Sequence, residues 1–286
     1  MNQNILRFLF YLILLGCGKS DPSSIDLNET QEPNSDDKYG MKLVWEDEFD
    51  YNGAVDAKKW HHQITPIMGS SWANGEVQHY TNRQENSYVS NGTLKIIAKK
   101  ERYTFQGNTK SYTSARLNTK YAFQYGRIDI RAKLPAEAGT WPAFWTLGAN
   151  INEVGNYHGN TYGSVGWPAC GEIDIMEQNG WDKNNLMGHL HWGNTQTTQY
   201  QNEGGTKRVQ NTASEFNLYS LEWTKNEIRI VFNNEVFNIK SIDNSMPYRF
   251  PHYVLFNIAM GGTLGGAIPA NFTQSVMEVD YIRIYQ

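Results

Sequence analysis

Three carboxylates lie close together in the chain and are the residues best placed to do chemistry. Glu172, Asp174 and Glu177 are separated only by large apolar side chains. On a helix these three acids would point in different directions. On a strand, Glu172 and Asp174 share a face because side chains alternate with a period of two, and one extra residue, a β-bulge, returns Glu177 to that face. We therefore predict a bulged strand that presents all three acids on one surface.

Glycoside hydrolysis would explain why three acids are brought together. Neighbouring carboxylates repel one another and their titrations couple, so folding alone does not favour the arrangement. In hydrolysis, one carboxylate attacks the anomeric carbon and another, kept protonated, donates to the leaving oxygen. A third acid between them can keep their ionisation states apart.

The alternative is an exposed strand that carries ordinary solvated acids. It predicts polar residues at the intervening positions, whereas these are Ile173, Ile175 and Met176. We expect Ile173, and either Ile175 or Met176, to enter the core.

Short strands dominate the sequence from about residue 41 onward. Several runs alternate apolar and polar residues, and one pair flanks Asn233–Asn234 as a hairpin, whereas no window predicts a long amphipathic helix. Strands at roughly 8–12-residue spacing predict a sandwich or a barrel. The stretch 148–166 is rich in Asn, Gly and Tyr, which predicts a long loop, and such loops are often functional. The expected strands include 94–98, 126–134, 218–223, 228–232, 235–237 and 276–285.

The first 40 residues have the composition of an export signal followed by a tether. Arg7 precedes the apolar run 8–15, which is too short to span a bilayer as a helix. The run ends at Gly16-Cys17, which resembles a bacterial lipoprotein signal in which the cysteine is lipidated; an ordinary signal peptide with a chance cysteine is the alternative. Acyl chains on Cys17 would hold the protein on a membrane. Residues 18–40 are polar and predict a flexible tether.

This organisation predicts a signal peptide over 1–17, a tether over 18–40 and a catalytic domain over 41–286. We expect the protein at the bacterial cell envelope, outer membrane or cell surface, in contact with a membrane only through its lipid anchor.

Composition narrows the classes of partner. The net charge of −4 gives no support for a nucleic-acid partner, which usually needs a basic patch. The chain has 9 Trp and 17 Tyr, rings that pack cores and also stack on sugars. Because lipidation accounts for Cys17, we expect no disulfide, and we expect Cys170 to be a small buried residue. No His/Cys cluster suggests a transition metal, and nothing indicates an oligomer, so a monomer is expected.

The acid motif has the form Glu-x-Asp-x-x-Glu, and other segments accompany it in a characteristic order: 43–49, 74–81, 114–116, 125–127, 131–135, 141–145, 167–168 and 279–285. Together they resemble glycoside hydrolase family 16, specifically its bacterial laminarinase and lichenase-like branch, over essentially all of residues 41–286. The resemblance implies an all-β fold, a β-jelly-roll sandwich of two antiparallel sheets with an open concave cleft. It also implies a retaining endo-hydrolase of β-1,3-glucan (laminarin) and/or mixed-linkage β-1,3-1,4-glucan.

The resemblance also assigns roles to individual residues. Glu172 corresponds to the nucleophile of a double-displacement mechanism and Glu177 to the general acid/base, with Asp174 tuning both and no cofactor for catalysis. We expect Trp145 to lie in the core, because it is next to Phe144 in an apolar run. The residues expected to contact the glucan polysaccharide or oligosaccharide are Asn74, Glu76 and Arg116 on the non-reducing side, Trp141 and Trp167 as stacking platforms, and His191 on the leaving-group side.

Relatives often carry a structural calcium ion away from the cleft. The matching positions here are Glu48, Gly92 (by its carbonyl) and Asp280, which offer the oxygen ligands that calcium takes; a member without the ion is the alternative. Two segments depart from the family pattern. The turn 261–266 lacks the Trp found in many relatives, and the insertion around 149–166 is longer than usual. We expect both to border the cleft, so the linkage preference stays open.

Two other functions remain open at this point. A galactanase of the same fold would act on agar, porphyran or carrageenan, but no basic cluster suited to sulfated substrates flanks the acids. A non-catalytic glycan-binding surface lipoprotein could use the same aromatic cleft, but its acids would be free to change.

Overall fold

The runs predicted to be strands are strands in the computed structural model, which describes residues 37–159, 161, 165–194 and 199–286. The predicted signal peptide, Cys17 and the tether up to residue 36 lie outside the described residues, so these assignments stay predictions. The hairpin around Asn233–Asn234 joins β15 (Glu227–Phe232) to β16 (Glu235–Ser241), and both asparagines have the positive φ of a tight turn.

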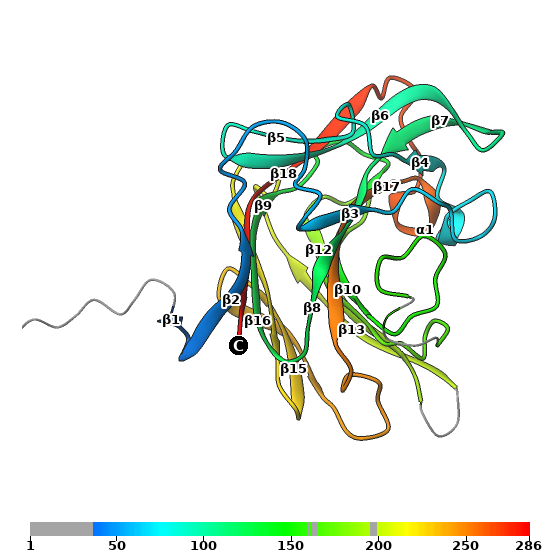
Figure 1. Ribbon diagram of the computed structural model, residues 1–286. Helices are drawn as coiled ribbons and strands as arrows, with labels where there is room; N and C mark the ends of the chain where they lie inside the picture. Colours follow the sequence, from blue (N-terminus) through cyan, green and yellow to red (C-terminus); the bar gives the residue numbers. More distant parts are fainter. Residues whose placement is uncertain (1–36, 160, 162–164, 195–198) are drawn as a thin grey trace, which may run out of the picture. The chain divides into compact units, whose positions relative to one another are not determined.

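The strands of the described residues form two sheets (Figure 1). We call the seven-stranded sheet the cleft sheet, because it carries the three acids, and the eleven-stranded sheet the outer sheet. The cleft sheet has the order β13 (Tyr200–Arg208), β12 (Asn185–Gly193), β11 (Glu172–Gln178), β10 (Thr140–Gly148), β17 (His252–Met260), β8 (Arg116–Phe123) and β3 (Trp60–His62).

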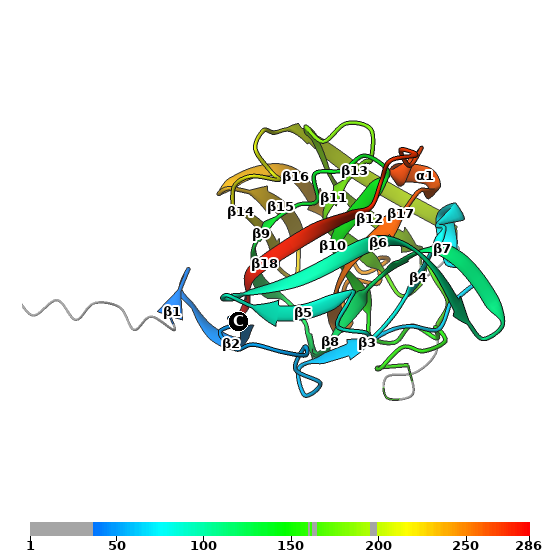
Figure 2. The same cartoon turned by 90° about the horizontal axis from the view of Figure 1, so that it is seen from above.

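The outer sheet continues from β16 and β15 through β14 to β9, β18 and β6, and β18 and β6 run side by side in Figure 2. Among the paired strands that the structure describes, only β4 and β7 are parallel, so the prediction of two antiparallel sheets is confirmed with that exception. Besides β15 and β16, the strands of this sheet are β1 (Asp37–Lys38), β2 (Met41–Asp47), β4 (Gln78–Tyr80), β5 (Ser87–Ser90), β6 (Thr93–Phe105), β7 (Asn108–Ser114), β9 (Gly126–Lys133), β14 (Asn217–Trp223) and β18 (Gln274–Tyr285).

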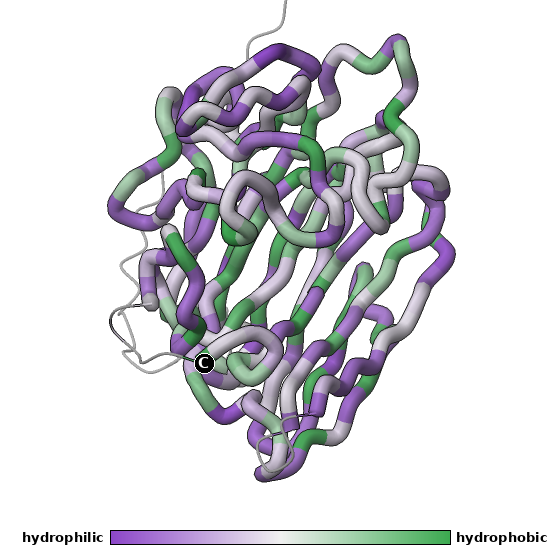
Figure 3. Tube along the Cα trace, turned by 90° about the vertical axis from the view of Figure 1, so that its right-hand side faces the viewer, coloured by the Kyte–Doolittle hydropathy of each residue, from purple (hydrophilic) through white to green (hydrophobic). Residues whose placement is uncertain are grey.

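The main core lies between the two sheets. Hydrophilic and hydrophobic residues alternate along many strands (Figure 3), as expected for strands with one buried face. Ile173 and Leu190 of the cleft sheet belong to the same buried cluster as Ile128 and Ile282 of the outer sheet, each at most 1% exposed. The cleft sheet therefore packs its apolar side chains on one face and leaves the other face for a binding site.

Within the part of the chain that the structure describes, helical structure is limited to two short segments, η1 (Ala73–Gly75) and α1 (Gly262–Gly265). They contact each other, and Thr263 Oγ1 donates a hydrogen bond to the Asn74 carbonyl oxygen at 3.2 Å. The turn that departs from the family pattern thus supports the segment that carries Asn74. Neither helix of the described residues is long and apolar enough to cross a membrane.

Candidate active site

Strand β11 has a bulge at the position predicted from the sequence. On its β12 side, Glu172 pairs with His191 and Asp174 with His189, but Glu177 pairs with Met187, so the register shifts between Asp174 and Glu177. The β10 side shows a matching shift. A regular strand would turn Glu177 away from Glu172, and the bulge brings all three acids onto the same wall of one cleft.

The apolar residues of β11 point into the core. Ile173, Ile175 and Met176 are 0%, 1% and 1% exposed. The sequence predicted that only one of Ile175 and Met176 would be buried, but both are. The strand is therefore fixed by its apolar side, and the acids are held without having to contribute to packing.

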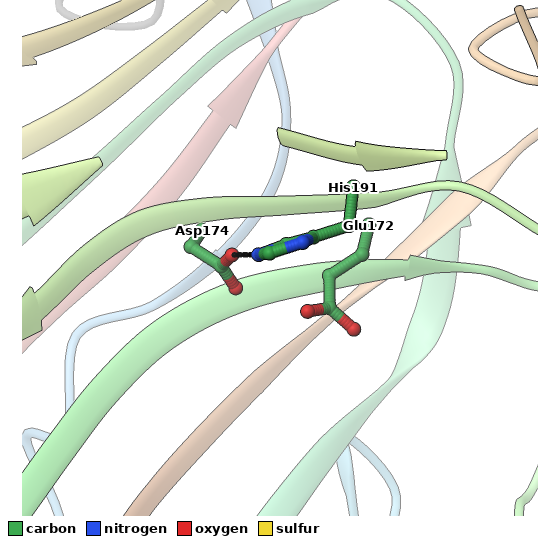
Figure 4. Close-up of side chains that lie close together, drawn as sticks. All are labelled: Glu172, Asp174 and His191. Carbon is green, nitrogen blue, oxygen red and sulfur yellow. Dashed lines mark ion pairs between the residues drawn. The ribbon is translucent and has the colours of Figure 1, made fainter. Parts of the chain in front are cut away.

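Each acid has a partner in the cleft. Trp167 Nε1 donates to Glu172 Oε2 at 3.1 Å, and Trp141 Nε1 donates to Glu177 Oε1 at 2.9 Å. The two tryptophans expected to be stacking platforms are thus also hydrogen-bond donors to the outer acids. His191 Nε2 lies 3.3 Å from Asp174 Oδ2, the ion pair drawn in Figure 4.

That ion pair is not aligned as a hydrogen bond. The buried Oδ2 of Asp174 has no hydrogen-bond partner among the described residues. One carboxylate oxygen of Glu172, one of Asp174 and a ring nitrogen of His191 all lie within 4.8 Å of one another. Charge on any of these three groups therefore acts strongly on the others.

The cleft favours the neutral form of the acids. Burial raises the pKa of Asp174 to about 8. Burial, followed by the charge of Asp174, raises the pKa of Glu177 to about 8. The same two causes raise the pKa of Glu172 well above its usual range, while the Trp167 hydrogen bond and protonated His191 lower it.

Because all three pKa values are raised, the three acids do not all carry a negative charge at neutral pH. When Asp174 and Glu177 are protonated, their charges no longer raise the pKa of Glu172. The Trp167 donor and His191 then favour placing one charge on Glu172. One ionised carboxylate beside a neutral one is the pair that glycoside hydrolysis needs.

Asn74, Glu76 and Arg116, the residues expected to contact sugar on the non-reducing side, belong to a network of polar side chains in the cleft. All three line the cleft. Glu76 Oε2 accepts hydrogen bonds from Gln78 Nε2 at 2.7 Å and from the Tyr80 hydroxyl at 3.2 Å. The Glu76 carboxylate is therefore held in place before any ligand binds.

Arg116 has a partner that the sequence did not predict. Its Nη2 donates to Glu153 Oε1 at 2.7 Å, and the two side chains are 6% and 11% exposed. Gln63 Nε2 donates to the same oxygen at 2.6 Å. Glu153 comes from the 149–166 insertion and lines the cleft, so the expectation that this insertion borders the cleft is met. The sequence did contain a clue to this role, because Glu153 is the only acidic residue of the insertion.

The prediction that Trp145 lies in the core is wrong. Trp145 lines the cleft, its Nε1 donates to Asn257 Oδ1 at 2.7 Å, and the Arg116 guanidinium lies 4.9 Å from its ring centroid. Its neighbour Phe144 is fully buried instead. Neighbouring strand residues face opposite sides, and the register of β10 placed Phe144 inward. Cys170 is buried, as predicted, and burial raises the pKa of its thiol.

The residues expected to bind calcium are not part of the cleft. Both carboxylate oxygens of Glu48 accept hydrogen bonds from Arg283, at 2.7 and 2.8 Å, and Asp280 pairs with Arg131. Gly92 lies in the turn between β5 and β6. The oxygen donors suit calcium, but each carboxylate already has a guanidinium partner that an ion would have to replace.

The two-sheet sandwich and a cleft with paired carboxylates define a class of protein, the glycoside hydrolases. The family model of "Glycosyl hydrolases family 16" matches residues 74–283. The chain therefore belongs to glycoside hydrolase family 16, and the observed sandwich is the β-jelly roll that the resemblance implied.

Individual relatives agree with this assignment. A beta-glucanase of Rhodothermus marinus is 38% identical over 266 residues, which cover 88% of this chain and 87% of the relative. A structure of LamA from Zobellia galactanivorans in complex with laminaritriose and laminaritetraose is 56% identical, with a TM-score of 0.85 over 85% of this chain and 98% of that one. The laminarinase catalytic domain of Thermotoga maritima is 35% identical, with a TM-score of 0.74 over 86% of this chain and 98% of that one.

Proposed function

We propose that this protein is a retaining endo-β-1,3-glucanase, a laminarinase. The observation that carries the proposal is the bulge in β11, which places Glu172 and Glu177 on one wall of a cleft that is lined with tryptophans. The relatives supply the substrate class, because a 56% identical protein of the same fold has been seen with laminari-oligosaccharides. The open concave cleft that the family resemblance implies suits attack within a polysaccharide chain.

The chemistry follows from the charges of the acids. Ionised Glu172 forms a bond to the anomeric carbon while the bond from that carbon to the leaving oxygen breaks, and neutral Glu177 gives its proton to that oxygen. Glu177, now ionised, then takes a proton from water as the water displaces Glu172. Two displacements at one carbon retain its configuration. Asp174 lies between the two in the sequence, and whenever it is ionised its charge raises the pKa of Glu177 further.

Release of reducing ends from three polysaccharides tests the function. The protein is incubated with laminarin, barley mixed-linkage β-glucan and agarose, and reducing ends and product sizes are followed. We expect a mixture of short oligosaccharides from laminarin, and Glu172→Gln is the inactive control. Release from agarose alone would show a galactanase, and tight binding without release from any substrate would show a glycan-binding protein. Activity on mixed-linkage glucan reports the linkage preference that the sequence left open.

A structural calcium ion at Glu48, the Gly92 carbonyl and Asp280 is a further proposal. Its support is the donor set, and its competitors are Arg283 and Arg131. We expect added calcium to raise the melting temperature and a chelator to lower it. Identical melting curves in both conditions would mean that the arginine pairs alone stabilise this edge of the sandwich.

A lipid anchor at Cys17 is likewise proposed from the leader sequence. Cys17→Ser is then expected to move the protein from the membrane fraction to the soluble fraction of cells that express it. The same distribution of both forms would mean that the cysteine is not lipidated.

A further inference from the structure

His191 has an oxygen partner on each side of its ring. Nε2 lies 3.3 Å from Asp174 Oδ2, and Nδ1 lies 2.8 Å from the phenolic oxygen of Tyr200. The rings of His191 and Tyr200 are parallel to within 6°, and their centroids are 6.0 Å apart. This separation places the hydroxyl group, rather than the face of the phenol ring, beside the imidazole. Tyr200 belongs to β13 and was not among the residues predicted to form the site.

The surrounding strands hold His191 in this position. His189 stacks on it with centroids 4.8 Å apart and 16° between the planes. On β13, the residue opposite His189 is Gly204, where a Cβ atom would lie 2.0 Å from His189 Nδ1. Gly204 therefore leaves the space that the His189 ring occupies. The Tyr248 hydroxyl donates to the His191 carbonyl oxygen at 3.1 Å and fixes the backbone.

The phenolic oxygen of Tyr200 can accept a hydrogen bond from Nδ1, and the Asp174 carboxyl group lies next to Nε2, so the surroundings suit a ring with both nitrogens protonated. Such a positive charge lowers the pKa of Glu172 and of Glu177. Burial and the charges of Glu172 and Asp174 raise the pKa of Tyr200, which therefore stays a neutral phenol. The titratable groups around His191 are Glu172, Asp174 and Glu177 from β11, His189 from β12, Tyr200 from β13, and Tyr248.

We propose that Tyr200 is a positioning residue for the catalytic acids. Its hydroxyl oxygen accepts a hydrogen bond from Nδ1–H of charged His191 and holds that charge beside Glu172 and Asp174. The charge favours the ionised form of Glu172, which must be ionised to attack. The inference rests on the proposed function, because only a nucleophilic Glu172 gives this placement of charge a purpose.

Tyr200→Phe tests the role of the hydroxyl alone. It keeps the ring beside Trp167, whose centroid is 5.4 Å away. On laminarin we expect kcat to fall about three- to tenfold with KM within about twofold. Without a fixed His191 the pKa of Glu172 rises, so the acid limb of kcat/KM should move up by about 0.5 to 1 pH unit, the size of one lost hydrogen bond. An unchanged kcat and an unchanged acid limb would overturn the proposal.

A double variant tests whether Tyr200 acts through His191. Tyr200→Phe combined with His191→Ala should be no slower than His191→Ala alone, because the first change has nothing left to position. Losses that multiply would contradict the proposal. Tyr121→Phe is the matched control: its hydroxyl contacts Gln286 Oε1 at 3.4 Å, away from the cleft, and wild-type kinetics are expected.

An NMR measurement separates this inference from the proposed function. The ring nitrogen shifts of His191, recorded over a pH series, need no turnover and should differ between wild type and Tyr200→Phe. If the wild type hydrolyses no glucan, the proposed function fails and the purpose given to Tyr200 fails with it. If the wild type is active but the His191 shifts are the same in both proteins, the positioning role alone is wrong.

Discussion

At the scale of single residues, the site depends on an unequal treatment of similar carboxyl groups. Glu172 and Glu177 both lie partly buried in the cleft, and both accept a hydrogen bond from a tryptophan. Their difference comes from what lies next to each. Asp174 is the neighbouring charge that acts most on both, but a carboxylate oxygen of Glu172 also lies within 4.8 Å of a His191 ring nitrogen. Burial raises the pKa of both groups, and the charge of His191 opposes that rise more directly at Glu172 than at Glu177.

This difference predicts the pH dependence of hydrolysis. Burial raises the pKa of Glu177 to about 8, and the acid must be protonated to serve the leaving group. Activity on laminarin should therefore fall as pH rises through about 8. Glu177→Gln should be slower by about 10²–10⁴-fold on polysaccharide, and much less affected on an aryl glycoside whose leaving group needs no proton.

A control separates the two acids in the same assays. Glu172→Gln should be inactive on both substrates, because the nucleophile is needed whatever the leaving group. Near-normal activity of Glu177→Gln on laminarin, with a wild-type basic limb, would show that another group supplies the proton.

At the scale of elements, the sequence was most informative where a pattern repeats along one strand. The acid spacing and the apolar residues between the acids predicted the bulge, because both depend only on β11 itself. Trp145 was misplaced because the choice between it and Phe144 depends on how β10 pairs with β17 and β11, which adjacent residues do not reveal. Glu153 was missed as a site residue because its role depends on where a long loop docks.

The contact between Glu153 and Arg116 gives a test of whether it holds the 149–166 insertion against the cleft. Both side chains are almost fully buried, so Glu153→Gln leaves an arginine charge without its partner. Breaking such a pair costs about 3–5 kcal/mol when it is fully buried. We expect a clear fall in melting temperature and a raised KM for laminarin, since Arg116 and Glu153 both line the cleft.

An exposed pair of the same chemistry is the control for this change. The Arg208 and Asp182 side chains are 66% and 37% exposed, so Asp182→Asn should leave the melting temperature close to that of the wild type. If Glu153→Gln were as stable and as active as the wild type, the insertion would not be held by this contact.

At the scale of the whole molecule, the two sheets treat charge differently. On the outer sheet, Asp129 is buried and accepts hydrogen bonds from Arg127 and Ser220. On the cleft sheet, Asp174 is also buried but has an oxygen without a hydrogen-bond partner among the described residues. The buried Asp129 of the outer sheet thus has hydrogen-bond partners, whereas the buried acids of the cleft sheet lower the stability of the fold, as is common in active sites.

That loss of stability should be measurable as a dependence of stability on pH. A carboxyl whose pKa is raised by folding binds its proton more tightly in the folded state. Its stabilising effect is complete below the unfolded pKa of about 4.3 and is lost as pH rises through the folded value. For Glu177 the folded value is about 8, so the wild type should lose stability across this interval.

Glu177→Gln removes this titration and should therefore melt higher than the wild type at pH 9. The gain should be about 2–6 °C for a domain of this size, and at pH 4 the two proteins should melt at nearly the same temperature. Glu235→Gln, at a carboxylate that is 71% exposed, is the control and should show no comparable gain at pH 9. A Glu177→Gln variant that melts lower than the wild type at pH 9 would mean that the Trp141–Glu177 hydrogen bond contributes more to the fold than burial of the acid costs it.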